Sequence, residues 1–256
     1  EYDTQRIASA AIFPPSPAYD TPHQAAALYA RLIDAVKRIP GIEDAAVVNH
    51  VGGRIPTRLE IPGSDASEIA NRGPVFYLTA SSEYAHVMGF HMVRGRWFDA
   101  ADMRAPDASG FVVNETMAKR YFPGMNPVGR IITAHRASQA RPDIGQPISG
   151  PIIGVVGDVH WFGRDNEVYA EVYVPYTREV WPWITLVARA KSPAVVAPAI
   201  RRAVFGVEPN IPLSSDNGYS GVQIPTRGGF DERELVLSTI GAFAVSALLL
   251  AAIGLY

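Results

Sequence analysis

The sequence predicts an α+β fold in which two strand–helix–strand units near the ends of the chain pair around a long β-rich insert. Three observations predict this fold. Patterns of strand and helix alternate in residues 1–53 and again in residues 184–215. Residues 54–183 instead carry short β-rich stretches separated by turn residues. After a linker at residues 216–234, residues 235–256 form one apolar run that predicts a transmembrane helix.

The first unit begins with residues 6–13 (RIASAAIF), an apolar run that predicts a strand because two prolines follow it. Thr21 and Gln24 then predict the start of a helix, since they can form a capping box around Pro22 at the first helical position. A Pro-Gly pair ends the helix, and residues 42–49 supply a second strand. The opening of the chain therefore predicts a βαβ unit, or its split version with another strand in between.

The second unit repeats this pattern. Residues 184–190 (ITLVARA) alternate like a half-buried strand, and a Ser-Pro pair starts a helix expected over residues 192–205. Pro198 lies deeper than the first turn, so it is expected to kink this helix or to move its start. Residues 211–214 are expected to form a short strand. We expect the two units to be halves of one layered sheet.

The insert is expected to contain mainly short strands, predicted at residues 58–61, 75–79, 111–114, 131–133, 152–159 and 171–174. Two helices are expected at residues 82–88 and 114–121. Residues 135–150 are polar and rich in proline, which predicts a surface loop.

Residues 235–256 contain no charged residue and no proline, and Ser238, Thr239 and Ser246 are their polar side chains. At about 1.5 Å per residue they make a helix of roughly 33 Å, against about 30 Å of bilayer hydrocarbon. The alternative is a buried helix of a soluble domain, which is usually shorter and keeps a polar stripe. A charged block at residues 231–234 marks where the chain leaves water. Small residues at every fourth position predict packing against other helices.

The composition is typical of a folded domain attached to a membrane. The net charge of −2 argues against a nucleic-acid partner. The absence of cysteine excludes disulfides, thiolate catalysis and cysteine zinc sites. Glu1 is not an initiator methionine and the first residues form no signal peptide, so we expect the chain to be part of a longer protein.

The sequence contains no nucleotide-binding loop of the form G-x-x-x-x-G-K-[ST], and the stretch from Gly154 to Gly157 (GVVG) lacks the lysine and the hydroxyl. ATP is therefore expected to bind another chain or another segment. A G-x-S-x-G nucleophile elbow is also absent. Asp158 and His160 would share a face of the expected strand, but without a nucleophile we interpret them as surface polar groups.

Glu83, His86 and His91 are the candidate residues for a metal site, because carboxylate and imidazole groups suit zinc. Their spacing does not match the H-E-x-x-H pattern on a helix. Structural or solvent-facing roles are therefore favoured for all three residues.

A set of aromatic residues could line a ligand surface, with packing in a core or between subdomains as the preferred interpretation: Trp161, Trp181, Trp183, Tyr173 and Tyr176. Asn114 begins a formal glycosylation sequon, which a bacterial envelope leaves silent. The sequence thus predicts no catalytic, cofactor-binding or metal-ligating residue.

Several motifs in order resemble the MacB-like periplasmic core domain of bacterial ABC-transporter permeases. They are MGFHMVRGRWFD at residues 88–99, VVNETMAKRYFPGMNPVGRII at 112–132, IGVVGDVHWFG at 153–163 and EVYVPY at 171–176. The final AFAVSALLLAAIGLY is similar to the second transmembrane helix of FtsX-superfamily permeases, especially the duplicated orphan permeases of acidobacteria.

The resemblance implies a periplasmic domain between two transmembrane helices in the bacterial inner membrane. Its porter-like subdomain would combine residues 1–53 and 184–215, and a β-rich Sabre-like subdomain would occupy residues 54–183. Relatives carry a charged helical segment before the second transmembrane helix, whereas residues 216–231 here are interrupted by glycine and proline, which disfavours a rigid stalk.

The resemblance also implies mechanotransmission, in which a cytoplasmic ABC ATPase drives movement in the periplasm for export or envelope work. The implied partners are that ATPase, a second permease copy in a dimer or pseudo-dimer, a periplasmic adaptor and membrane lipid. The alternatives from the residues alone are a membrane-tethered extracytoplasmic enzyme, using Glu83, His86 and His91, and a tethered binding module.

Overall fold

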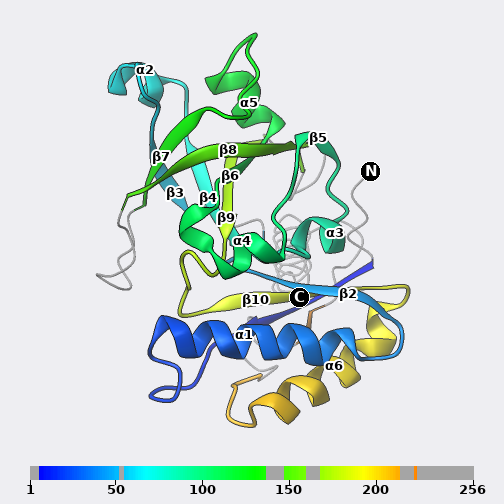
Figure 1. Cartoon of the computed structure of the whole chain (residues 1–256). Helices are drawn as coiled ribbons and strands as arrows, with labels where there is room; N and C mark the ends of the chain where they lie inside the picture. Colours follow the sequence, from blue (N-terminus) through cyan, green and yellow to red (C-terminus); the bar gives the residue numbers. More distant parts are fainter. Residues whose placement is uncertain (1–5, 52–54, 137–146, 160–167, 214–221, 224–256) are drawn as a thin grey trace, which may run out of the picture.

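The computed structural model describes residues 6–51, 55–136, 147–159, 168–213 and 222–223, and the following account concerns those residues (Figure 1). Within them, no helix is both long enough and apolar enough to cross a membrane. The expected linker at residues 216–234 and the expected transmembrane helix at 235–256 lie outside the described residues, apart from Val222 and Gln223.

The two terminal units form a single two-layer body, seen in the lower part of Figure 1. Its elements are β1 (Ile7–Ile12), α1 (Pro22–Lys37), β2 (Ile42–Val48), β10 (Ile184–Ala190) and α6 (Pro193–Val207). Strand β10 lies between β1 and β2 and is antiparallel to both, with Val187 opposite Ser9 on one side and Ala46 on the other. The opening unit is therefore the split version of βαβ, and the predicted pairing of the two units is confirmed.

Helix α1 begins as its sequence predicts. The Thr21 hydroxyl accepts from the Gln24 N–H, and the Gln24 side chain accepts from the Thr21 N–H, each at 3.3 Å. The buried side chains of α1 recur at helical spacing and pack with α6 against the sheet. Helix α6 starts at Pro193, and Pro198 lies inside it, so Pro198 does not move the start of the helix.

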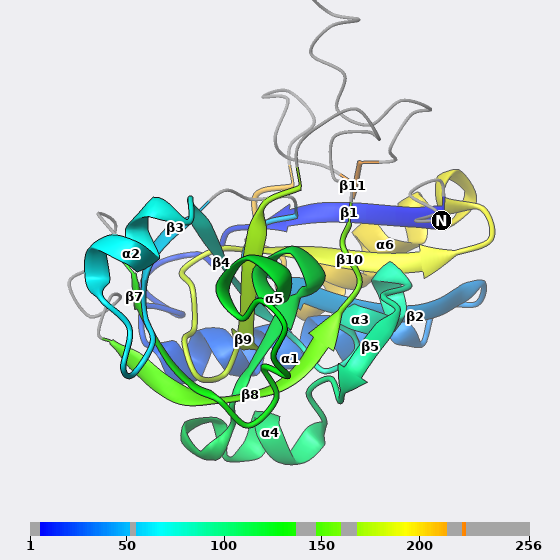
Figure 2. The same ribbon diagram turned by 90° about the horizontal axis from the view of Figure 1, so that it is seen from above.

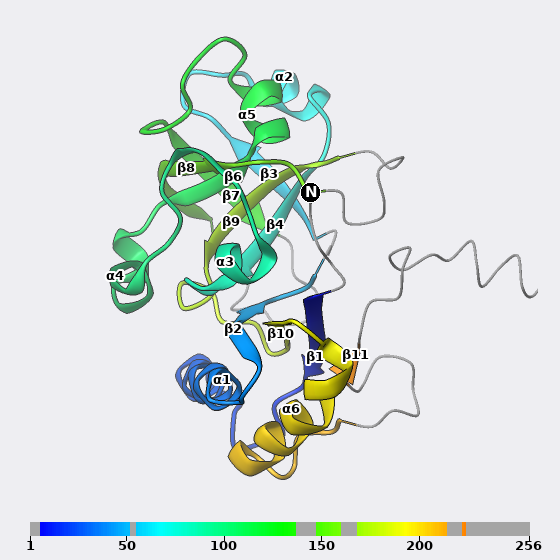
Figure 3. The same cartoon turned by 90° about the vertical axis from the view of Figure 1, so that its right-hand side faces the viewer.

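The sheet of this body presents two apolar faces because successive side chains of a strand point to opposite sides. On β2, Ala45 and Val47 pack with the helices, whereas Ala46 and Val48 point to the other face. That second face is covered by the insert, as Figure 3 shows.

The insert is built around strands that close into a ring in the described residues. Following the hydrogen-bonded neighbours, the ring consists of β4 (Val75–Ala80), β3 (Pro56–Glu60), β7 (Ile131–Arg136), β8 (Ile148–Val156), β6 (Phe111–Asn114) and β9 (Ala170–Pro175), which returns to β4. Strand β5 (Met92–Gly95) pairs with β8 outside the ring. Because every ring strand has partners on both sides, the barrel exposes no long free edge of its own.

Short helices surround the barrel, namely α2 (Ala66–Asn71), α3 (Tyr84–Met88), α4 (Ala100–Arg104), the 3-10 turn η2 (Pro106–Ala108) and α5 (Glu115–Tyr121). The expected helices at residues 82–88 and 114–121 correspond to α3 and α5, and Asn114 caps α5 by accepting from the Met117 N–H at 2.9 Å. The barrel interior is filled by aromatic and β-branched side chains such as Phe111, Val113 and Val172.

Three sequence predictions differ from the structure, one in the two-layer body and two in the insert. The strand expected at residues 211–214 is not present in the described part, residues 211–213, because β11 (Val222–Gln223) occupies the outer edge of β1, and β4 occupies that of β2. Ile211 and Leu213 are buried in the helix-side core all the same. Only the ends of the loop expected at residues 135–150 are strand, because β7 and β8 pair through Thr133 and Ser149. Residues 137–146 of that loop lie outside the described residues. Strand β8 ends at Val156 and not at Val159.

Candidate functional site

The candidate site is the junction at which the two-layer body meets the barrel. Strands β2 and β4 share one backbone pair there, Val48 opposite Ala80. Buried polar side chains extend this short contact on both sides. The Asn49 carboxamide oxygen accepts from the Thr79 N–H at 3.1 Å, and the Ser81 hydroxyl accepts from the Val47 N–H at 3.2 Å. These bonds matter because unpaired backbone groups would otherwise be buried at the junction.

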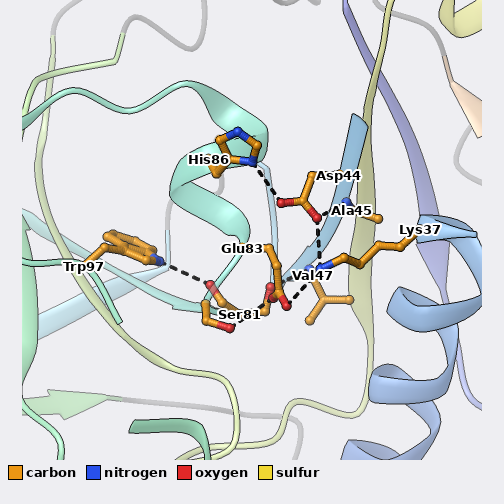
Figure 4. Close-up of polar contacts among 9 residues, drawn as sticks. Lys37, Asp44, Ala45, Val47, Ser81, Glu83, His86 and Trp97 are labelled. Atoms are coloured by element: carbon orange, nitrogen blue, oxygen red, sulfur yellow. Dashed lines mark hydrogen bonds and ion pairs between the residues drawn. The ribbon is translucent and has the colours of Figure 1, made fainter. Parts of the chain in front are cut away.

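A cluster of charged side chains crosses the junction at its surface (Figure 4). The Lys37 ammonium, at the end of α1, lies 3.2 Å from an Asp44 carboxylate oxygen on β2 and 3.5 Å from Glu83, at the N-cap of α3. His86 of α3 lies 2.9 Å from the other Asp44 oxygen. The cluster therefore ties the last turn of α1 and β2 to the helix that follows β4.

Asp44 is the most enclosed member of the cluster, with 13% of its side chain exposed. Burial alone raises the pKa of Asp44, but hydrogen bonds from His86, the Ala45 N–H and Lys37 outweigh it and hold that pKa below its ordinary value. Burial lowers the pKa of Lys37, but its contacts with Asp44 and Glu83 raise the pKa by more than burial lowers it. The pKa of Lys37 is therefore above its ordinary value. Both pKa shifts mean that the cluster favours the charged forms, the Lys37 ammonium and the Asp44 carboxylate.

Arg189 makes a second connection, from β10. Its side chain donates to the Val87 carbonyl near the end of α3 at 2.6 Å. Helix α3 ends at Met88, and its C-cap Gly89 adopts a left-handed conformation with a φ of 70°. A Cβ at Gly89 would lie 3.1 Å from the Arg189 guanidinium, so glycine provides both the conformation and the space for this contact.

Beneath these polar contacts the two bodies share a hydrophobic core. It combines Ile7, Ala46, Val48 and Val187 of the two-layer body with side chains of the insert, including Leu78, Tyr84, Met88, Val112 and Tyr173. Trp97 packs edge-on to Phe90 at 5.8 Å and donates to the Ser81 carbonyl at 3.3 Å. Side chains of the two bodies are therefore packed against one another in a single close-packed core.

The comparisons with known proteins agree with this architecture. The family model that matches is the MacB-like periplasmic core domain, over residues 1–204. The chain belongs to the MacB-like periplasmic core domain family. The resemblance inferred from the motifs is thereby confirmed.

Solved structures of similar fold come from three sources. The periplasmic region of MacB from Actinobacillus actinomycetemcomitans is 12% identical, with a TM-score of 0.52, and the match covers 80% of this chain and 85% of that one. A domain of a putative permease protein from Porphyromonas gingivalis is 11% identical, with a TM-score of 0.51 and coverage of 91% and 95%. The extracellular domain of the noncanonic ABC-type transporter YknZ from Gram-positive bacteria is 17% identical, with a TM-score of 0.49 and coverage of 78% and 93%.

The first two likenesses show that the MacB-like domain and this chain share a mixed α/β fold. A comparison with curated protein sequences found no significant match.

In this MacB-like domain Glu83 and His86 belong to the charged cluster at the junction, and His91 does not. Glu83 contacts Lys37 and His86 contacts Asp44. His91 is exposed beyond α3, and its backbone carbonyl accepts from the Gly157 N–H at 2.8 Å. The described residues contain no group of three or more His, Asp or Glu side chains that could hold a metal ion.

Asp158 was expected on a strand, but it follows the end of β8. Its carboxylate accepts from the Thr116 N–H and hydroxyl, each at 2.8 Å, and so holds the first turn of α5. His160 lies outside the described residues. Asn114 of the formal sequon is buried, and its side chain bonds the backbone of Tyr169 and Glu171.

The candidate aromatic residues do not form one surface. Tyr176 is buried in the helix-side core. Trp181 is also buried, and its carbonyl accepts from the hydroxyl of Tyr29 in that core at 2.7 Å. Trp183 packs edge-on to Trp181 at 5.3 Å. Tyr173 belongs instead to the shared core at the junction. The preferred interpretation as packing residues is confirmed for Tyr173, Tyr176 and Trp181, which are buried, whereas Trp183 is half-buried. Trp161 lies outside the described residues.

Sequence reasoning missed the junction itself. No role was predicted for Lys37, Asp44 or Arg189, because charged residues in helices and strands usually face water. One signal was available, since the charged pair Glu43 and Asp44 lies near the start of an otherwise apolar strand, shortly after the Pro-Gly turn that follows Lys37.

Replacing Asp44 with asparagine is expected to lower the free energy of unfolding at neutral pH by about 1 kcal/mol, because the Lys37 and His86 contacts lose their anion. The depressed pKa of Asp44 means that its contribution is complete above its ordinary value of 3.8 and is lost as the pH falls below that value. Denaturant unfolding measured from pH 6 down to pH 3 should therefore show a smaller difference between variant and parent at the acid end. An equal difference at all pH values would contradict this assignment. The matched control is Asp34→Asn on the exposed face of α1.

Proposed function

We propose that this domain is the periplasmic part of an ABC-type permease and transmits movement driven by a cytoplasmic ATPase to export or envelope work. The observation that carries the proposal is the arrangement of the described chain ends. Strand β11 runs antiparallel beside β1, with Gln223 opposite Ser9 (Figure 2). Strand β11 therefore runs toward the end of the sheet at which β1 begins, as a domain inserted between two membrane helices requires.

The separate cores support a division into subdomains. A porter-like subdomain would combine residues 1–53 and 184–215, whose core lies between the sheet and the two long helices. A Sabre-like subdomain would occupy residues 54–183, with its core inside the barrel. Movement at the membrane end of β1 would pass through β10 and β2 into the barrel, because the shared core and the Lys37 cluster leave little freedom between them.

This function requires no bond-making chemistry in the domain, and we propose no catalytic, cofactor-binding or metal-ligating role for its residues. The proposed partners are a cytoplasmic ABC ATPase, a second permease copy, a periplasmic adaptor and the lipid around a helix at residues 235–256. The proposed location is the bacterial inner membrane, with the described domain in the periplasm.

Topology and partnership can be tested on the full-length protein with a single cysteine at Val195, because the sequence has no native cysteine and this side chain is 77% exposed on α6. The proposal predicts modification by a membrane-impermeant maleimide in cells with a permeabilised outer membrane. It also predicts that the protein purified from membranes brings with it an ATPase that vanadate inhibits. Modification only after the inner membrane is broken, or purification without any ATPase, would contradict the proposal.

A further inference from the structure

A shallow hollow lies on the outer surface of the barrel, between β5 and α5. Its floor is apolar and consists of the buried Phe122, Pro127 and Val155. Its volume is about 200 Å³. That is below the roughly 300–1,000 Å³ of small-molecule pockets, so the hollow suits a side chain of a peptide better than a free metabolite.

Two apolar side chains on the rim are exposed to solvent. Val93 of β5 is 39% exposed, and Met125, in the turn after α5, is 49% exposed. Val93 lies at a register shift, since Met92 pairs with Val156 and Arg94 pairs with the adjacent Val155. Such a bulge re-aims a side chain and commonly lies next to a functional site. Exposed apolar groups around an apolar floor indicate an interaction surface.

The charge on the rim selects among partners. Arg94 and Lys119 line the hollow, and Arg130 lies beside it, 3.7 Å from the sulfur of Met125. The acidic residue in the lining is Glu115, which pairs with Lys119 at 3.2 Å. Among the described residues, neither Arg94 nor Arg130 has a carboxylate within ion-pair distance. The rim is therefore cationic on a chain whose net charge is −2.

The backbone of β5 offers a further means of binding. Among the described strands β5 pairs with β8 alone, so its second edge has no strand partner. An extended peptide can add to such an edge by backbone hydrogen bonds, while its side chains give specificity.

We propose that this hollow docks an extended segment of a partner protein, in which an apolar side chain is flanked by carboxylates. The apolar side chain would enter between Val93 and Met125 and rest on Phe122. The flanking carboxylates would pair with Arg94 and Arg130. This inference goes beyond the proposed function, because it concerns the outer face of the barrel and not the Lys37 cluster at the junction, and it holds whether or not the domain transmits force.

The first test measures binding of a fluorescent peptide of alternating aspartate and leucine to the full chain in detergent, without ATP or ATPase. The dissociation constant should rise about tenfold or more in the double variant Arg94→Glu, Arg130→Glu, because like charges then face the peptide. The single variant Met125→Ser should also weaken binding. The matched control is Arg202→Glu on the exposed face of α6, which should bind as the parent does.

Matched peptides separate the contributions of charge and apolar contact. Lysine in place of aspartate, or serine in place of leucine, should abolish binding. Equal binding of the lysine peptide, no binding of the aspartate–leucine peptide, or equal loss in the double variant and in Arg202→Glu would each overturn the proposal.

The second test identifies the occupant in membranes with a photo-cross-linking residue at Met125 in the full-length permease. Adducts should map by mass spectrometry to an acidic and apolar segment of another protein. Adducts that map to a second copy of this chain or to lipid would overturn the proposal, as would protein adducts on basic segments.

Discussion

Replacing Leu78 with alanine is expected to lower the free energy of unfolding by about 2–5 kcal/mol, the range for truncation of a buried leucine. Leu78 is 1% exposed on β4 and belongs to the core shared by the barrel and the two-layer body. A cavity there removes contacts on both sides of the junction. The loss should therefore weaken the cooperativity between the two bodies as well as their stability.

Denaturant unfolding followed by tryptophan fluorescence and by far-UV circular dichroism tests this expectation. The parent should show coincident transitions, and the variant should show transitions that separate. The control is Val195→Ala, which truncates an exposed side chain and should change the stability by less than about 0.5 kcal/mol. Coincident transitions in the variant at parental stability would show that the shared core does not join the two bodies.

Replacing Gly154 with alanine is expected to destabilise the domain by about 3 kcal/mol, because the added methyl group has no room. A Cβ at this position would lie 2.1 Å from the Arg96 carbonyl oxygen and 3.0 Å from its carbon. These are backbone atoms next to β5, so a side-chain rotation cannot relieve the overlap. Strand β5 should separate from β8, and the hollow between β5 and α5 should be lost with it.

The matched control is Gly206→Ala. Gly206 is near the end of α6, and apart from its chain neighbours and the backbone of its own helix, no described atom lies within 4 Å of a Cβ at this position. Alanine should stabilise this helix by about 0.5 kcal/mol because it restricts the unfolded chain and favours helix. Thermal unfolding of both variants measures the contrast. A Gly154→Ala variant as stable as the parent would contradict the close approach of β5 and β8.

Local sequence patterns were sufficient to predict the elements whose structure depends on residues nearby in the sequence. The capping box of Thr21 and Gln24 places the start of α1, and the alternation in residues 184–190 identifies β10. The pairing of the terminal units also followed, because each unit alone would expose an apolar face.

Other elements could not be predicted, because their structure depends on contacts with distant parts of the chain or because they are too short to show a pattern. Residues 211–213 have a strand-like pattern, yet no sheet edge remains for them, since β11 and β4 take the two available edges. Strand β5 escaped prediction because three of its four residues are exposed and its pairing with β8 relies on a bulge. Helices α2 and α4 are too short for a clear apolar period.

The side-chain contacts at the junction also could not be predicted from local sequence. Glu83, His86 and His91 suggested a possible metal site because they are close in sequence. In the folded domain Glu83 instead contacts Lys37, and His86 contacts Asp44. Both partners belong to a different part of the chain. Spacing along one segment contains no information about such partners.

The central claim is that this domain moves as one body when the ATPase binds nucleotide. Pulsed electron–electron double resonance can test it in the assembled permease, with spin labels at Val195 on α6 and at Ile131 on β7, which are 77% and 47% exposed. Trapping nucleotide with vanadate should change the distance between the Val195 labels of the two copies, while the distance from Val195 to Ile131 within one copy stays the same. A distance between copies that does not respond to nucleotide, or a change confined to the distance within one copy, would contradict the account.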